Sequence, residues 1–161
     1  MEHLAKGPDY DVWLDSLDRP FKFHSPFSGD DFVVMLVVND ITITEGERAE
    51  LSTNIVRQGC RYAVCTGHGC STWNDVIDMA FLETDPNFNP PDDRFVMTTW
   101  HDDEPLEEVV TYFWLNTAFD DFTPKNFVVL LLGQDTVSEA KTRRALAQSL
   151  KTNERSDREI E

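Results

Sequence analysis

The stretch Phe32-Val-Val-Met-Leu-Val-Val38 decides the fold, because it contains seven consecutive apolar residues with no polar residue between them. A strand with one face in water alternates apolar and polar residues, whereas an uninterrupted apolar run indicates a strand buried on both faces. Strands of this kind occur in parallel sheets that helices cover on both sides. The stretch therefore predicts a parallel sheet between two layers of helices.

The rest of the chain alternates between strand-like and helix-like segments. Three more strands are expected at 61–65, 94–100 and 127–132, where β-branched, aromatic and aliphatic residues gather. Amphipathic helices are expected after each of the four strands, at 44–58, 72–83, 104–118 and 136–150. Two of these helices begin with the residues of a capping box, Thr44 with Glu47 and Thr72 with Asp75. Four successive strand–helix units predict right-handed crossovers onto one sheet.

We predict a single α/β domain over residues 1–150, a flavodoxin-like or Rossmann-like three-layer sandwich with a four-stranded parallel sheet of order 2-1-3-4. Residues 1–30 contain three prolines and are expected to form an irregular arm, with one short helix at 9–17, packed across the sheet by its aromatic side chains. Residues 151–161 have mixed charge, and we expect them to form a disordered tail.

The net charge of the chain limits the classes of molecule that it is expected to bind. Among 161 residues, 30 acids stand against 14 bases, which gives a formal net charge of −16. Such a surface repels phosphate backbones and anionic lipids, so direct binding of nucleic acid or of a membrane is disfavoured and a basic protein is the expected partner. The N-terminus lacks the features of a signal peptide, and three closely spaced cysteines do not form a disulfide framework. These features predict a reduced, cytoplasmic protein.

The candidate site lies where strands meet helices. In Phe95-Val-Met-Thr-Thr-Trp-His-Asp-Asp-Glu-Pro-Leu-Glu-Glu108 a strand runs directly into a helix start, with Pro105 in the first helical turn. Ligands of open α/β sheets bind beyond the carboxyl ends of the strands, and the order 2-1-3-4 places the loops after strands 1 and 3 around one crevice. The residues expected at this edge are Asp40, His68, His101, Asp102, Asp103 and Glu104.

Three kinds of chemistry remain open for these residues. Carboxylates such as Asp40 and Asp102, with His101, suit Mg²⁺ or Mn²⁺ that orients a phosphate or a water. Thiolates and imidazoles suit Zn²⁺, and the set for it is Cys65, His68, Cys70 and His101, although its spacing matches no established zinc motif. The acids also have an explanation that needs no metal ion, because acids before a helix interact favourably with the helix dipole.

The third chemistry is anion binding by Cys65-Thr-Gly-His-Gly-Cys-Ser-Thr72. A cysteine, a glycine turn and a helix N-terminus together would lower the pKa of the thiol and offer amides to a phosphate. This loop resembles the phosphocysteine loop of the sugar-phosphotransferase IIB proteins, in which the loop follows the first strand rather than the second. A glycine turn ahead of a capped helix explains the same residues without a ligand.

Two segments carry a wider resemblance, Thr98-Thr-Trp-His-Asp-Asp-Glu-Pro-Leu-Glu-Glu108 and Asn126-Phe-Val-Val-Leu-Leu-Leu-Gly133. With them the chain resembles, over about residues 30–150, a family of small bacterial proteins described only as a domain of unknown function. The resemblance implies a bacterial or phage-related cytoplasmic setting and no particular activity.

Two functions follow as hypotheses. The first is an acidic, non-enzymatic binding or regulatory module of a bacterial defence or toxin–immunity system, which contacts a partner through the rim from His101 to Glu104. The second is a divalent-metal-dependent enzyme acting on a phosphorylated or nucleotide-like ligand, with Asp40, His101 and Asp102 as metal or acid–base groups.

Overall fold

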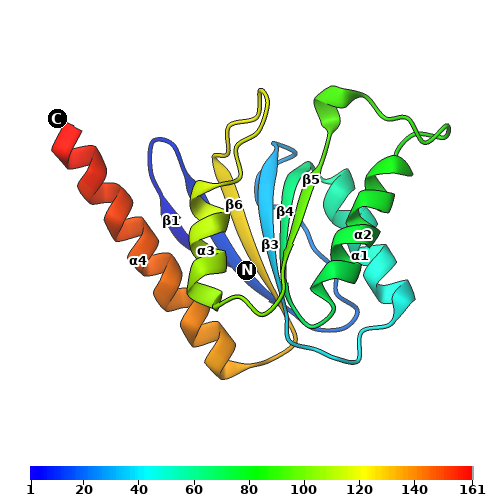
Figure 1. Cartoon of the computed structure of the whole chain (residues 1–161), viewed down its shortest axis with the longest axis horizontal. Coiled ribbons are helices and arrows are strands. Elements are labelled where there is room, and N and C mark those ends of the chain that lie inside the picture. The colour runs from blue at the N-terminus through cyan, green and yellow to red at the C-terminus, as the bar shows by residue number, and fades with distance from the viewer. Residues whose placement is uncertain (161) are drawn as a thin grey trace.

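The structure, a computed structural model, describes residues 1–160, with their side chains as far as residue 152. Its elements in chain order are β1 (Glu2–Lys6), β2 (Asp11–Leu17), β3 (Phe32–Val38), α1 (Glu45–Arg57), β4 (Cys60–Gly67), α2 (Cys70–Leu82), a 3-10 helix (Asp92–Arg94), β5 (Met97–His101), α3 (Leu106–Leu115), β6 (Asn126–Leu132) and α4 (Thr136–Ile160). Figure 1 shows three layers, with α1 and α2 on one side of the sheet and α3 and α4 on the other.

The seven residues of β3 are all buried, as their apolar run predicts. Val34 and Leu36 belong to the core on the side of α1 and α2. Val33, Met35 and Val37 belong to the core on the side of α3 and α4. Both faces of the strand therefore contribute to hydrophobic packing, which confirms the α/β class.

The sheet has six strands, in the order β1-β2-β6-β3-β4-β5. Strand β1 is antiparallel to β2, and the other five strands run parallel to one another. The predicted four-stranded sheet of order 2-1-3-4 is therefore wrong. The four predicted strands occur in the order 4-1-2-3, and β2 adds a fifth parallel strand beside β6.

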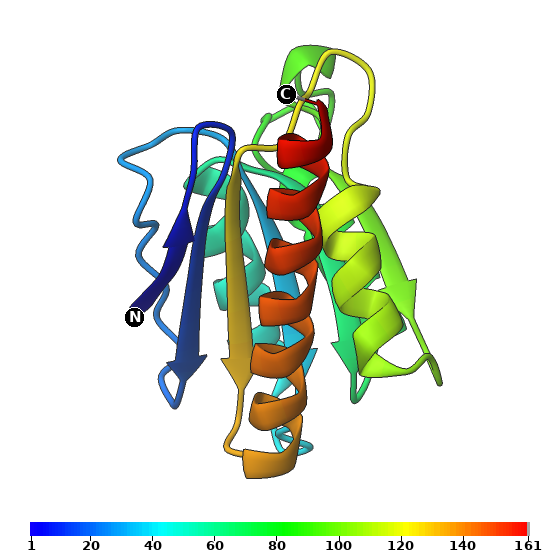
Figure 2. The same ribbon diagram turned by 90° about the vertical axis from the view of Figure 1, so that its left-hand side faces the viewer.

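The helix layers explain this order. Helices α1 and α2 pack on the same face, so right-handed crossovers carry the chain from β3 to β4 to β5 in one direction. Helix α3 packs on the opposite face, beside α4, and a right-handed crossover there carries the chain back past β3 to β6. Figure 2 shows α3 and α4 in front of the sheet. An apolar pattern identifies a buried strand but does not reveal which face its crossover helix covers.

The first thirty residues contain two strands, so the irregular arm with a short helix at 9–17 is a wrong prediction. Strand β2 forms because every one of its residues pairs with β6, whereas a helix of nine residues is marginally stable on its own. The irregular part is the connection from 18 to 31. Its aromatic side chains Phe21, Phe23 and Phe27 are buried in the core beside α1, as expected for the arm.

The helix ends agree with the sequence in one case and differ in others. The capping box of α1 is present, with Thr44 as its N-cap and Glu47 as the reciprocal partner. Helix α2 begins at Cys70 after Gly69 and has no side-chain cap, so the box predicted at Thr72 is wrong. Helix α4 continues to Ile160. The disordered tail expected at 151–161 stays a prediction, because residue 161 and the side chains from 153 onward lie outside the described residues.

No helix among the described residues combines the length and the apolar character that crossing a membrane requires.

Candidate functional site at the carboxyl edge of the sheet

The five parallel strands all end at one edge of the sheet, here called the carboxyl edge. The predicted residues lie there: Asp40 follows β3, His68 follows β4, and His101 is the last residue of β5. Asp102, Asp103 and Glu104 come next in the connection to α3 and are exposed. The structure thus places all six predicted residues at one edge of the sheet.

The strand order nevertheless separates Asp40 from His101. Strand β4 lies between β3 and β5, so the loops with Asp40 and His101 are not neighbours. The crevice predicted between the loops after strands 1 and 3 therefore does not exist. Five prominent surface cavities among the described residues, with volumes from about 230 to about 510 Å³, are lined by other residues than Asp40, His68 and His101.

The true topological switch point lies between β3 and β6, where the chain direction across the sheet reverses. Doubly wound folds bind their ligands at such a point. Here backbone contacts close it: the amides of Asn39 and Asp40 both donate to the carbonyl of Leu132 at 2.8 and 2.9 Å. A Cβ atom on Gly133 would lie 2.8 Å from the Cβ and amide nitrogen of Asp40. The loops after β3 and β6 are thus in direct contact.

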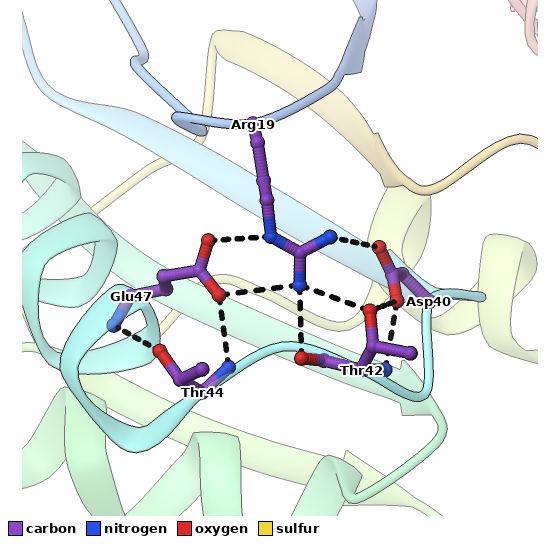
Figure 3. Close-up of polar contacts among 5 residues, drawn as sticks. All are labelled: Arg19, Asp40, Thr42, Thr44 and Glu47. Carbon is purple, nitrogen blue, oxygen red and sulfur yellow. Dashed lines mark hydrogen bonds and ion pairs between the residues drawn. The ribbon is translucent and has the colours of Figure 1, made fainter.

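Arg19, in the connection after β2, completes the closure (Figure 3). Its Nε and Nη2 donate to the two carboxylate oxygens of Glu47 at 2.8 and 3.2 Å. Nη2 also donates to the carbonyl and hydroxyl oxygens of Thr42 at 2.8 and 2.9 Å, and Nη1 lies 3.4 Å from Asp40 Oδ2. Because β6 lies between β2 and β3, this network links the connections on its two sides.

The acids of this network are held ionised. Hydrogen bonds from the hydroxyl and amide of Thr42, together with Arg19, keep the pKa of Asp40 below its ordinary value. The amide of Thr44 and the Arg19 guanidinium lower the pKa of Glu47 in the same way. A carboxylate and a capping box thus occupy the α1 N-terminus, where a phosphate would otherwise bind. Sequence reasoning missed Arg19, since no motif marks it.

His101 is buried beneath the edge rather than open to solvent. Its Nδ1 lies 2.5 Å from Glu104 Oε2, and its Nε2 lies 3.0 Å from Thr99 Oγ1. Its ring packs against Tyr112 of α3 at 4.6 Å between centroids. Both ring nitrogens therefore have partners within the chain, so His101 fixes the β5–α3 connection while the neighbouring acids face solvent.

The residues proposed for zinc do not come together. The Cys65 side chain is fully buried in the core, whereas His68 lies exposed between two glycines. Within residues 1–152 the structure brings no three histidine, cysteine or acidic groups into a set that fits a metal ion. This applies equally to the proposed Mg²⁺ or Mn²⁺ ligands, Asp40, His101 and Asp102. The metal sites stay hypotheses that the geometry does not support.

The anion cradle at 65–72 also differs from the prediction. Burial raises the pKa of the Cys65 thiol well above its ordinary value, and burial raises the pKa of Cys70 as well. A phosphate-accepting thiolate requires the opposite shift. The expected lowering of the thiol pKa is therefore wrong, because Cys65 points into the apolar core and Cys70 is buried at the start of α2.

The carboxyl edge is strongly acidic outside the connection after β2, which brings Arg19 to Asp40 and Glu47. The four connections 39–47, 67–72, 102–108 and 133–140 contain ten acids and no lysine or arginine. Acids in the first turns of α1 and α3 interact favourably with the helix dipoles, which explains part of this number. Asp102 and Asp103 precede their helix and are exposed. Two large apolar side chains also face solvent here, Ile41 at 71% and Val137 at 63% exposure.

One family matches the sequence. The model of a family described as "Domain of unknown function (DUF7684)" matches residues 5–149. No curated protein matches the chain.

Proposed function

Because the chain belongs to the family described as a domain of unknown function (DUF7684), a description that names no activity, we propose its function from its own residues. It is an acidic binding or regulatory module that contacts a basic protein through the carboxyl edge of the sheet. The proposed setting is a bacterial defence or toxin–immunity system in the cytoplasm. The free, buried thiols of Cys60, Cys65 and Cys70 suit a reducing compartment.

The observation that carries the proposal is the absence of bases from four adjacent connections that hold ten acids. Charges of one sign on one side of a protein attract an oppositely charged partner over distance and speed its association. Exposed Ile41 and Val137 add apolar area beside these charges, as in interfaces whose centre is apolar and whose rim is polar. The carboxyl edge thus has both components of a protein interface.

The closed switch point supports a protein partner over a small ligand. The Arg19 network and the contact between the loops of β3 and β6 fill the place where a nucleotide would bind in a doubly wound fold. A protein needs only an accessible surface, whereas a small ligand needs a concave site that encloses it. We therefore favour the binding module over a metal-dependent enzyme acting on a phosphorylated ligand.

The test compares two triple variants with the same net charge. The first, Glu45→Lys, Asp102→Lys and Glu107→Lys, reverses charges at the carboxyl edge. The control, Asp9→Lys, Asp30→Lys and Glu50→Lys, reverses charges elsewhere. The side chains of all six acids are exposed, and none forms a hydrogen bond or an ion pair among the described residues. Both triples therefore change the charge by the same amount without removing a side-chain hydrogen bond or ion pair. Because Glu45 and Glu107 also interact with helix dipoles, the melting temperatures of both triples are compared with that of the wild type.

The probe is a fluorescent lysine oligopeptide, whose affinity is measured by anisotropy at low and at high ionic strength. Three lost ion pairs of about 0.5 kcal/mol each predict binding about tenfold weaker for the carboxyl-edge triple. The control triple should bind within about twofold of the wild type, because screening limits the reach of its distant charges. Equal weakening in both triples would mean that net charge alone governs binding, and the proposed surface would be wrong.

A further inference from the structure

The outer side of β5 is an unprotected strand edge. Strand β5 ends the sheet and pairs only with β4, so its other side has no strand partner within the described chain. Proteins usually protect such edges with a bulge, a lysine or a proline. The opposite edge, β1, has both an irregular register between His3 and Ala5 and a terminal lysine. Strand β5 has a regular register and contains no lysine, arginine or proline.

A large aromatic side chain marks this edge. Trp100 is 54% exposed, although tryptophan is rarely left in water without a partner. Side chains alternate along a strand, so Trp100 shares a face with Thr98, whose hydroxyl donates to Asp78 of α2 at 2.6 Å. The other face bears Met97, which packs against the core on the α3 side, and Thr99. One face of β5 therefore bears Trp100 beside the carboxylate of Asp78, and the other bears Met97, Thr99 and the buried His101.

The edge lies in the most acidic part of the molecule. Residues 62–124, here called the acidic half, contain thirteen acids and one base, Arg94, a formal charge of −12 out of −16 for the whole chain. The acidic half includes α2, β5, α3 and nearly all of β4. Acids stand on both sides of β5 in the chain, with Asp92 and Asp93 before it and Asp102 and Asp103 after it. Asp102 and Asp103 thus lie at the end of β5, whereas its start lies beside Arg94 and Arg61, whose Nε donates to the carbonyl of Phe95 at 2.9 Å.

We propose that the open edge of β5 binds an extended, lysine- or arginine-bearing segment of a partner protein, which adds a strand to the sheet. Backbone hydrogen bonds hold the segment, and the alternating faces of β5 select its side chains. Basic side chains lie on the face of Trp100 and Asp78, where a cation interacts with both the indole ring and the carboxylate. Apolar side chains lie on the face of Met97.

Charge complementarity selects this occupant over a second copy of the chain. Two copies that pair through β5 bring together two acidic halves of charge −12 each, which repel each other. A basic segment has the opposite charge and meets no such barrier. The inference rests on the proposed function, since it assumes a basic partner protein, and it adds the strand that receives this partner and the conformation of the bound segment.

The test uses synthetic peptides of about nine residues, which is long enough to span β5 at about 3.3 Å per residue. An alternating lysine–valine peptide is compared with a block peptide of the same composition. Two further versions carry N-methyl groups on every second residue, in one register or in the other. Binding is measured by isothermal titration calorimetry to the full chain.

We expect the alternating peptide to bind at least tenfold more tightly than the block peptide. One methylated version should lose binding and the other should keep it, because only one side of an added strand faces β5. Equal affinity of both methylated versions overturns the proposal. If the lysine oligopeptide still depends on Glu45, Asp102 and Glu107 in that case, the proposed function stands and strand addition alone fails.

Protein variants provide the second measurement. Trp100→Lys should weaken binding of the alternating peptide at least tenfold, and Trp100→Ala should weaken it in the same direction. Leu115→Lys changes a similarly exposed apolar residue at the end of α3, away from both β5 and the carboxyl edge, and should leave the affinity within twofold. Equal effects at 100 and 115 contradict the assignment to β5. A dimer in sedimentation velocity that Trp100→Lys abolishes also overturns it, since the edge then binds a second copy.

Discussion

Replacing Gly67 with alanine tests whether close backbone contact closes the carboxyl edge. Gly67 ends β4 with a φ of +91°, and a Cβ atom there would lie 2.3 Å from the carbonyl oxygen of Val38 and 2.9 Å from its amide nitrogen. These are backbone atoms of the neighbouring strand, so no change of rotamer relieves the overlap. The same carbonyl accepts a hydrogen bond from the amide of His68 at 2.8 Å. Alanine at 67 must therefore push β3 and β4 apart where they end.

Gly69, two residues further on, is a matched control. It also has a positive φ, +65°, but apart from its own chain neighbours no atom of the described residues lies within 4 Å of a Cβ placed there. Alanine at 69 therefore costs about 1 kcal/mol, the strain of a left-handed backbone. At position 67 the same strain adds to the loss of a hydrogen bond of about 1 kcal/mol and to the displacement of a packed strand. We expect Gly67→Ala to destabilise the fold by about 3 kcal/mol or more.

Urea unfolding, followed by circular dichroism, measures the difference in the free energy of unfolding between the two variants, and thermal unfolding measures their melting temperatures. At about 2–4 °C per kcal/mol for a domain of this size, Gly67→Ala should lower the melting temperature by roughly 6–12 °C and Gly69→Ala by roughly 2–4 °C. Hydrogen exchange of the variant should increase at the ends of β3 and β4 more than at their centres. Equal destabilisation of the two variants would refute the steric argument, because backbone strain alone would then explain both.

Three further predictions concern metals, thiols and pH. Melting temperatures should be unchanged by EDTA, Mg²⁺, Mn²⁺ or Zn²⁺, and a clear rise with one of these ions would support the metal-dependent enzyme instead. Cys60, whose pKa burial raises to about 12, and the buried Cys65 should resist iodoacetamide in the native protein at neutral pH and react once urea unfolds it, as intact-mass spectrometry will show. Thr42→Val should raise the pKa of Asp40, measured by NMR titration. A carboxyl group whose pKa is lowered in the folded state stabilises the fold above its ordinary pKa, and this stabilisation is lost as the pH falls through the lowered pKa. The wild type should therefore lose more stability than this variant between about pH 4 and pH 2.

The sequence predicts the buried strands well and their order poorly. The apolar runs of β3 and β6 indicate burial on both faces, because a local pattern determines which side chains leave water. The order depends on the face that α3 covers, and this is decided by packing between helices far apart in the chain. Strand β2 was also missed: Val12 and Leu14 alternate with Asp11 and Asp15 as in a strand, but nearby prolines favoured an irregular arm.

In the candidate site, too, local interactions could be predicted from the sequence and interactions between distant residues could not. The capping box of Thr44 and Glu47 was predicted, because its two residues are three positions apart and their interaction is local. Arg19 was not predicted as part of the site, although it contacts Glu47, 28 positions away, and Asp40, 21 positions away. Only the fold brings these groups together. The sequence did contain the charge imbalance of the acidic half, and counting acids and bases by segment would have found it.

The negative charge of the acidic half accounts for how the edge of β5 can stay open. An uncharged strand with a free edge and an exposed Trp100 tends to pair with another copy of itself, which leads to aggregation. In this chain β5 has no lysine and no bulge, but two acidic halves, each of formal charge −12, repel each other. That repulsion acts on copies of the chain and on other acidic proteins, whereas it becomes attraction for a basic segment. The same charges therefore keep the edge free and select the partner that occupies it.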